Sequence, residues 1–319
     1  MIAILSSPDS FQNKNEMVKI RNIIKEEGSG IIHYEVKNFQ DIGEALSRFN
    51  QCSVSAIAIV GGQALSSATF EYLIDKKPFG AEQIPISVLS GDEERFISQS
   101  FGATSTHAHQ DLKRILRKHK NGRLLDHTVK APLIKVEGVM HVGKLYGLYF
   151  CTGEIISRKS LFKRTIHRSG IKQLIQNYTT IISLLYKAYL GSKRSDDISD
   201  MIRINRNQRG AVVGRYFMVL LSSLDWIFLG TRFPDKHKAD SLNFLSVENT
   251  KDAIMNTGKR MLKGSYGEKV LPGHVITEIE HARLVFNKQF VVDGCFYETD
   301  KSGELIISAA EDLTFIHIA

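Results

Sequence analysis

Short apolar runs alternate with amphipathic stretches over the first 125 residues. Runs at 1–5, 31–36, 54–60 and 84–89 predict strands, and the run at 54–60 ends directly at Gly61. Apolar residues at helical spacing predict helices between the strands, around 17–24, at about 65–77, after Ser90 and at about 110–120. Strands that alternate with helices predict βαβ units, and therefore a parallel sheet with helices on both faces.

The pattern changes after Gly122 to one typical of antiparallel strands. Alternating segments at 129–136 and 145–150 predict a hairpin, and helical insertions are predicted near 160–190 and 250–263. Further strand candidates with turn residues between them lie at 201–204, 212–222, 242–247, 274–286, 289–292 and 305–309. We therefore expect an α/β domain at 1–125 and a mainly antiparallel, β-sandwich-like domain at 126–319.

The composition is that of a globular protein with an excess of positive charge. Apolar residues make up 43% and charged residues 24% of the 319 residues, which excludes collagen-like, coiled-coil and intrinsically disordered chains. Lys and Arg number 42 and Asp and Glu 34, so the net charge is +8. This balance favours an anionic partner, such as a nucleotide, an anionic lipid or nucleic acid.

The cysteines and the apolar segments favour a cytoplasmic location. Cys52, Cys151 and Cys295 are far apart, which argues against a disulfide framework or a zinc ribbon and fits a reduced, intracellular protein. The five apolar residues at the N-terminus are too short for a signal peptide. No segment reaches the roughly 20 apolar residues of a membrane span, so we expect a soluble protein or one peripheral to the inner membrane face.

A glycine pair stands where a predicted strand meets a predicted helix. Gly61-Gly62 would let a phosphate approach the backbone, and the helix N-terminus offers free N–H groups and the positive end of the helix dipole. Any tight strand-to-helix turn also favours glycine, so the pair alone is compatible with a purely structural role.

Further motifs follow the segment Ala58–Leu65 in an ordered series. The strand candidate at 84–89 leads to Ser90-Gly91-Asp92-Glu93-Glu94-Arg95-Phe96, and Phe228–Pro234 precedes an Asp-containing loop from Asp235 to Asp240. Val291-Val292-Asp293-Gly294-Cys295 follows near the C-terminus. In this order and over nearly the whole chain, the series resembles the diacylglycerol kinase family, which includes sphingosine and ceramide kinases and bacterial lipid kinases.

The resemblance implies a nucleotide-binding-like domain at 1–125, a lipid-binding-like domain at 126–319, and a nucleotide cleft between them. Active relatives transfer the γ-phosphate of ATP to a lipid hydroxyl with Mg²⁺, so the cofactors are ATP and Mg²⁺ if this protein is active. By motif position, the resemblance assigns cofactor contacts to Gly61, Gly62, Gln63, Ser90 and Gly91, metal contacts to Asp235 and Asp240, and catalysis to Asp293 and Cys295.

The departures from the family pattern fall on these same loops. Where the family has Gly-Gly-Asp-Gly-Thr, this chain has Gln63, Ala64 and Leu65 after the glycine pair, so an acid, a flexible position and a hydroxyl are missing. Cys295 replaces the family's glutamate, regarded as the proton acceptor, and a thiol near its ordinary pKa is a poor general base for an alcohol. The acids at 92–94 would repel a polyphosphate, but they also match a helix capping box.

The most basic stretch lies at 157–172 and contains no acid. Its Lys and Arg residues, interleaved with apolar side chains, suit an interfacial helix that docks on anionic headgroups, although the solvated face of an ordinary helix remains the alternative. These residues are Arg158, Lys159, Lys163, Arg164, Arg168 and Lys172. Nucleic acid is disfavoured because aromatic stacking positions among the basic residues are not evident.

Two functions follow from these observations. The first is a lipid-binding or regulatory protein on a lipid-kinase fold, with catalysis lost or weak, whose partner is a lipid with a free hydroxyl or an anionic headgroup. The alternative is an active ATP-dependent lipid kinase. His107 and His109 could pair on a metal ion, but the sequence offers no third ligand near them.

Overall fold

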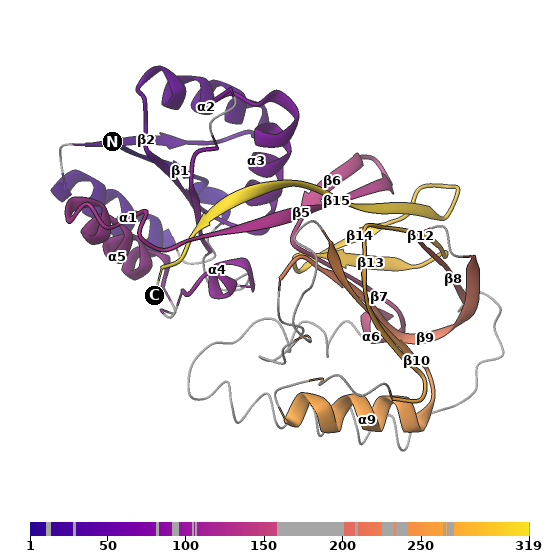
Figure 1. Cartoon of the computed structure of the whole chain (residues 1–319). Coiled ribbons are helices and arrows are strands. Elements are labelled where there is room, and N and C mark those ends of the chain that lie inside the picture. The colour runs from indigo at the N-terminus through magenta and orange to yellow at the C-terminus, as the bar shows by residue number, and fades with distance from the viewer. Residues whose placement is uncertain are drawn as a thin grey trace. The chain divides into compact units, whose positions relative to one another are not determined.

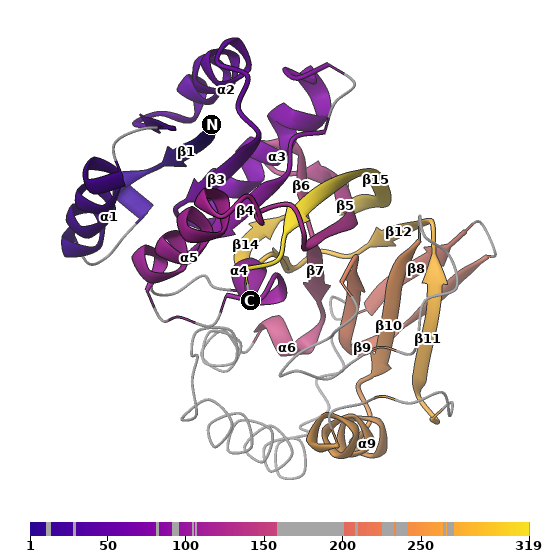
Figure 2. The same cartoon turned by 60° about the vertical axis from the view of Figure 1, so that its left-hand side comes forward.

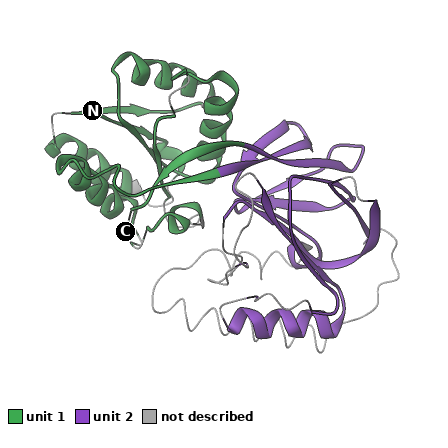
Figure 3. Cartoon of the chain, viewed as in Figure 1, with its two compact units in different colours: residues 1–131, 311–319 green, residues 132–310 purple. Residues whose placement is uncertain are grey.

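The computed structural model describes the chain apart from residues 11–13, 28–29, 81–82, 91–95, 104, 106, 158–200, 208–209, 225–232, 234–240, 264–265, 267–270 and 319. The described chain divides into two compact units, drawn in green and purple in Figure 3. Unit 1 comprises Met1–Ala131 and Glu311–Ala319, and unit 2 comprises Pro132–Ala310.

Unit 1 is built on a parallel sheet. Its strands, in spatial order, are β2 (Ile31–Glu35), β1 (Ile2–Ser6), β3 (Ala56–Val60), β4 (Ile86–Leu89) and the end of β15 (Glu304–Ile316). Every residue of β1, β3 and β4 is buried, which explains why these strands appear in the sequence as uninterrupted apolar runs. The pairs β1–β2, β1–β3, β3–β4 and β4–β15 are all parallel, as the strand–helix alternation predicts.

Helices cover both faces of this sheet (Figure 1). One face packs against α1 (Lys14–Glu27) and α5 (Ala108–Lys120), and Ile2, Ile4 and Ala58 share a core with apolar residues of both helices. The other face is covered by α2 (Ile42–Gln51) and α3 (Gln63–Lys76). The short elements of this unit are η1 (Pro8–Ser10), η2 (Phe39–Asp41) and α4 (Phe96–Ser100). The expected α/β architecture is confirmed.

Unit 2 consists of two antiparallel sheets that share one strand. The strand β9 (Ala211–Ser222) pairs with β8 (Met201–Arg206) along its first half and with β7 (Tyr149–Thr152) and β10 (Leu242–Glu248) along its second half. Buried residues from both sheets, including Phe150, Leu221 and Leu284, form one core between them. The β-sandwich-like arrangement expected from the sequence is confirmed.

The remaining elements extend these two sheets, and Figure 2 shows β9, β10 and β11 side by side. The first sheet continues from β8 through β12, β15 and β5 to β6, and the second extends to β11 on one side and to β13 and β14 on the other. Their bounds are β5 (Thr128–Val139), β6 (Gly143–Gly147), α6 (Glu154–Ser157), α9 (Lys251–Leu262), β11 (His274–Ile279), β12 (His281–Val285), β13 (Gln289–Val292) and β14 (Cys295–Glu298).

Two apolar runs that the sequence predicts as single strands are each divided between two strands. The run at 274–286 becomes β11 and β12, and at the break the backbone N–H groups of Glu280 and His281 donate to Oδ1 of Asn207 at 3.0 and 3.2 Å. The run at 145–150 breaks at Leu148, where β6 ends and β7 begins. Both corrections have the same cause: the chain changes sheets at the break, and a side chain accepts the N–H groups that leave the ladder.

The C-terminal strand runs further than the sequence predicts. The sequence predicts a strand at 305–309 and places it in the β-rich domain, whereas β15 extends from Glu304 to Ile316. Its start pairs with β12 in unit 2, and Phe315 near its end pairs with Ile86 of β4 in unit 1. Residues 311–319 therefore belong to unit 1. The predicted helix at 160–189 lies outside the described residues.

Candidate functional site

The glycine turn of unit 1 connects β3 to α3. Gly62 is the N-cap residue of the helix, with φ −80° and ψ 176°, and as a glycine it supplies no side-chain cap. The N–H of Gly61 donates to the carbonyl of Leu89 at 3.1 Å, which ties the turn to the end of β4. Gln63 begins the helix and is only 3% exposed. The helix start therefore offers backbone donors and its positive dipole end, with no acid in the first turn.

Side chains cover Gly61. A Cβ atom at this position would lie 2.8 Å from Cδ2 of Leu65 and 3.2 Å from Oγ of Ser10. Leu65 is fully buried, so its side chain belongs to the core and occupies the space beside the turn. A glycine fits here without displacing these side chains, whereas any larger residue would have to push them aside. Ser90, at the end of β4, is buried as well, and Gly91 lies outside the described residues.

Asp293 is the first residue of the tight two-residue turn between β13 and β14 in unit 2, and Cys295 follows the turn as the first residue of β14. Asp293 has φ +49° and Gly294 has φ +100°, the two positive values that a type I′ hairpin turn requires. Asp293 is 1% exposed, and both of its carboxylate oxygens accept from the backbone N–H of Leu148, at 3.0 and 3.1 Å. Cys295 is half-buried and pairs with Val292 in the hairpin.

The carboxylate of Asp293 stabilises the break between β6 and β7. Leu148 is the residue at which the chain passes from one sheet to the other, and its N–H has left the ladder. The residue before Leu148 is Gly147, where a Cβ atom would lie 2.5 Å from both Oδ2 of Asp293 and Cγ1 of Val292, so a side chain has no room there. The two aspartates that the sequence assigns to a metal, Asp235 and Asp240, lie outside the described residues.

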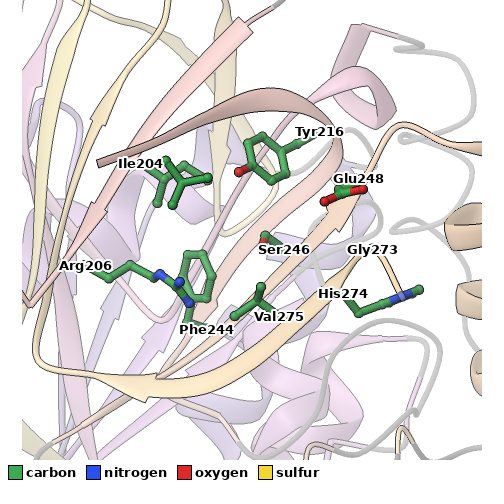
Figure 4. A pocket seen from close by; sticks show the side chains of 10 residues that line it. Ile204, Arg206, Tyr216, Phe244, Ser246, Glu248, Gly273, His274 and Val275 are labelled. Carbon is green, nitrogen blue, oxygen red and sulfur yellow. The ribbon is translucent and has the colours of Figure 1, made fainter. Parts of the chain in front are cut away.

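Unit 2 also contains a pocket that sequence reasoning missed. It has a volume of about 130 Å³ and is shown in Figure 4. Its lining comes from β8, β9, β10, β11 and the residue before β11, namely Ile204, Arg206, Val212, Tyr216, Phe244, Ser246, Glu248, Gly273, His274 and Val275. The alternation of side chains along β10 places Phe244, Ser246 and Glu248 on one face of the strand. This alternation is the only feature of the sequence that points to the pocket.

The pocket combines an apolar floor with charged groups. Ile204 and Phe244 are buried, and the guanidinium carbon of Arg206 lies 5.0 Å from the centre of the Phe244 ring, within cation–π range. Figure 4 places Arg206 and Phe244 on one side of the pocket and Glu248 and His274 on the other. The site can therefore hold a small group with both apolar and polar parts.

A hydrogen-bonded network fixes His274 at the edge of this pocket. Its Nδ1 lies 2.9 Å from the carbonyl of Pro272 and its Nε2 lies 2.8 Å from Oγ1 of Thr257, which also accepts from the hydroxyl of Tyr266. Burial lowers the pKa of His274, although Glu248 and the carbonyl of Pro272 oppose the shift. Nδ1 can bond to the Pro272 carbonyl only as a donor, and the Thr257 hydroxyl lies within hydrogen-bond distance of both Nε2 and the carbonyl of Ala253, at 2.8 and 2.9 Å.

Comparison with known proteins bears on the fold. No protein-family model and no curated protein matches the sequence. Among solved structures, the chain is similar to a "putative diacylglycerol kinase from Bacillus anthracis str. Sterne", with a TM-score of 0.63, 12% identity and coverage of 99% of this chain and 95% of that one. A second structure, described as a diacylglycerol kinase from the same organism, matches with a TM-score of 0.58 and 12% identity over 99% of this chain and 96% of that one.

The chain has a diacylglycerol-kinase-like fold. Within this fold, the glycine turn and Ser90 belong to unit 1, and the Asp293 hairpin and the pocket belong to unit 2. Among the described helices, none is long and apolar enough to cross a membrane.

Proposed function

We propose that this protein uses a lipid-kinase-like fold to bind a lipid or to regulate a lipid-dependent process, and that phosphoryl transfer is lost or weak. The observation that carries the proposal is the packing at the glycine turn. Phosphate binding at such a turn relies on close approach to exposed glycine backbone. Leu65 and Ser10 instead cover Gly61, and Gln63 supplies a neutral amide where the family has an acid.

The hairpin at Asp293 supports the same conclusion. A catalytic carboxylate must reach the group whose proton it accepts. Asp293 is buried, and both of its oxygens accept from the N–H of Leu148, so the carboxylate already serves the fold. Cys295, at the position of the family's glutamate, is a weak general base in its thiol form. On this proposal, neither Asp293 nor Cys295 takes part in phosphoryl transfer.

The pocket of unit 2 is our candidate for the lipid contact. A volume of about 130 Å³ is slightly smaller than an engineered cavity of about 150 Å³ that binds benzene, so it suits a headgroup or the end of a chain rather than a whole lipid. Arg206 can pair with an anionic headgroup, and Ser246 and Glu248 can accept a hydrogen bond from a lipid hydroxyl. Val212 and Val275 are exposed and extend its apolar surface.

The basic stretch at 157–172 is the proposed membrane contact. Apart from Ser157 it lies outside the described residues, so this part of the proposal rests on its sequence. Six Lys and Arg residues are interleaved with apolar residues, and the stretch contains no acid. Each basic residue close to an anionic surface contributes about 1 kcal/mol. A location at the inner membrane face would follow from this attraction.

The second candidate function is an active ATP-dependent lipid kinase. The observation in its favour is the N-terminus of α3, a helix of 14 residues whose N-cap residue, Gly62, has no side chain to cap it. Its backbone N–H groups and dipole could still attract a phosphate. Binding of ATP, measured with and without Mg²⁺, separates the two functions.

The test is calorimetric titration of the purified full chain with ATP and ADP. We expect a Kd of about 1 mM or weaker, equivalent to about −4 kcal/mol. The variant Q63D/A64G/L65T restores the family's loop and should bind ATP more tightly, especially with Mg²⁺. The conservative variant L65I is the control, because it keeps an apolar side chain beside Gly61. Micromolar ATP affinity of the wild-type protein would contradict the proposal and favour the active kinase.

A further inference from the structure

Three side chains of the types that bind transition metals meet in unit 1, two of them neighbours in sequence and the third, Glu16, more than 90 residues away. Glu16 comes from α1, His107 precedes α5 and His109 lies in its first turn. Oε1 of Glu16 lies 2.8 Å from Nδ1 of His109, and Oε2 lies 3.7 Å from Nδ1 of His107. One potential ligand atom from each residue falls within 4.8 Å of the other two. The third ligand that the sequence lacks near the two histidines is therefore Glu16.

Glu16 is held rigidly at this position. Its side chain is 2% exposed, and Oε1 accepts a hydrogen bond of 2.9 Å from the backbone N–H of His109, across a sequence separation of 93 residues. The carboxylate thus caps the N-terminus of α5 from another helix, where the helix dipole favours a negative charge. This capping explains why a buried acid is stable here, but it occupies only part of the hydrogen-bonding capacity of the two oxygens.

His107 provides a second, independent indication of a ligand. Its Nδ1 atom is buried from solvent and has no hydrogen-bond partner, although it faces Oε2 of Glu16. Helix capping does not explain this arrangement, because the His107 side chain makes no capping hydrogen bond to α5. A buried imidazole nitrogen that is left unpaired beside a carboxylate is poorly stabilised by the protein alone. A metal ion between the two groups would satisfy both.

We propose that Glu16, His107 and His109 bind one Zn²⁺ ion. Zinc bonds of about 2.0–2.1 Å to nitrogen and oxygen in a tetrahedron place neighbouring ligand atoms about 3.3 Å apart. The observed separations of 2.8 and 3.7 Å, each to a different oxygen of Glu16, lie on either side of that value. All three ligand atoms fall within 4.8 Å of one another, so the side chains would have to close around the ion. Two imidazoles and one carboxylate suit zinc, whereas Mg²⁺ and Ca²⁺ prefer oxygen ligands alone.

The geometry also indicates what the ion would do. His107 is 42% exposed while Glu16 and His109 are mostly buried, so the fourth coordination position faces the His107 side and is available to water. The ion would link α1 to the start of α5 and would stabilise unit 1 whenever zinc is present. This site is independent of the proposed lipid function, because none of its residues belongs to the glycine turn or the pocket.

The experiment measures zinc binding to the full chain after treatment with a chelator. Equilibrium dialysis and calorimetry should give one Zn²⁺ per chain with a Kd of about 1 μM or tighter, undisturbed by millimolar Mg²⁺. Saturating zinc should raise the melting temperature by at least about 3 °C. Co²⁺ in place of zinc should give the intense visible absorption bands of a tetrahedral site.

The variant H107Q tests the assignment without disturbing the buried capping carboxylate. It should weaken zinc binding by at least about tenfold and abolish the zinc-dependent rise in melting temperature, while the melting temperature without metal stays unchanged. H127Q is the matched control, since His127 is an exposed histidine of the same unit outside the cluster. No stoichiometric binding, or equal effects of the two variants, would overturn the proposal and identify the binding as adventitious.

Discussion

Replacing Asp293 with alanine should destabilise unit 2 strongly. The N–H of Leu148 would lose its acceptor in a fully buried position, which costs about 1–3 kcal/mol. Alanine would also have to adopt φ near +49°, at a further cost of about 1–2 kcal/mol. We therefore expect the free energy of unfolding to fall by about 3 kcal/mol. Asparagine keeps an acceptor oxygen and tolerates positive φ, so D293N should cost about 1 kcal/mol or less.

Urea denaturation followed by far-UV circular dichroism measures these differences, and coincidence with near-UV signals checks for independent unfolding of the two units. D300A is the matched control, because Asp300 lies in another turn of unit 2, where it is exposed and accepts from the N–H of Ser302. The reasoning is refuted if D293A costs no more than D300A, or if alanine and asparagine are equivalent. A large loss of phosphotransfer in D293N with unchanged stability would instead point to the catalytic role that the family resemblance implies.

Three further predictions follow. G61A should lower the free energy of unfolding by about 1–3 kcal/mol, because its Cβ would lie 2.8 Å from Leu65. A double-mutant cycle with L65A should show coupling between the two sites, and additive effects of the two substitutions would contradict the packing argument. Burial lowers the pKa of His274, so on acidification the unfolded chain binds a proton at this residue at a higher pH than the folded chain does. The free energy of unfolding should therefore fall as the pH drops below about 6.5, and an NMR titration that gives His274 an ordinary pKa of about 6.5 would exclude this contribution. The wild-type chain should sediment with anionic vesicles at low salt and be released from them at high salt, whereas the variant K163E/R164E/R168E should not bind. Equal binding by the variant would show that the basic stretch is only a solvated surface.

Local patterns in the sequence predicted most of the elements, because most of them bury a continuous face. The β1 and β3 segments are apolar throughout and were found within a residue or two. The helix α2 was missed, even though Ile42, Ala45, Leu46 and Phe49 recur at helical spacing and are all buried. Its short length and the polar residues between these positions concealed the pattern.

The strand breaks at Leu148 and Glu280 could not be predicted, because their causes are distant in sequence. At Leu148 the acceptor is Asp293, 145 residues away, and at Glu280 it is Asn207, 73 residues away. Hydrophobic alternation is unchanged when a strand passes from one sheet to the other, so an apolar run shows no sign of the break. The same limit applies to Glu16, which joins the histidine pair only through the packing of α1 against α5.

The candidate site divides into positions that the fold itself requires and positions that it does not. The resemblance matches Gly61 to a family glycine, and the packing of Leu65 favours a glycine there whether or not a phosphate binds. Asp293 and Gly294 also keep the family's residues, and the type I′ turn and the N–H of Leu148 account for both. The departures at Gln63 and Cys295 fall where neither constraint applies. The fold accounts for the first set in either function, so a stability measurement cannot separate the two functions. The ATP titration decides between them.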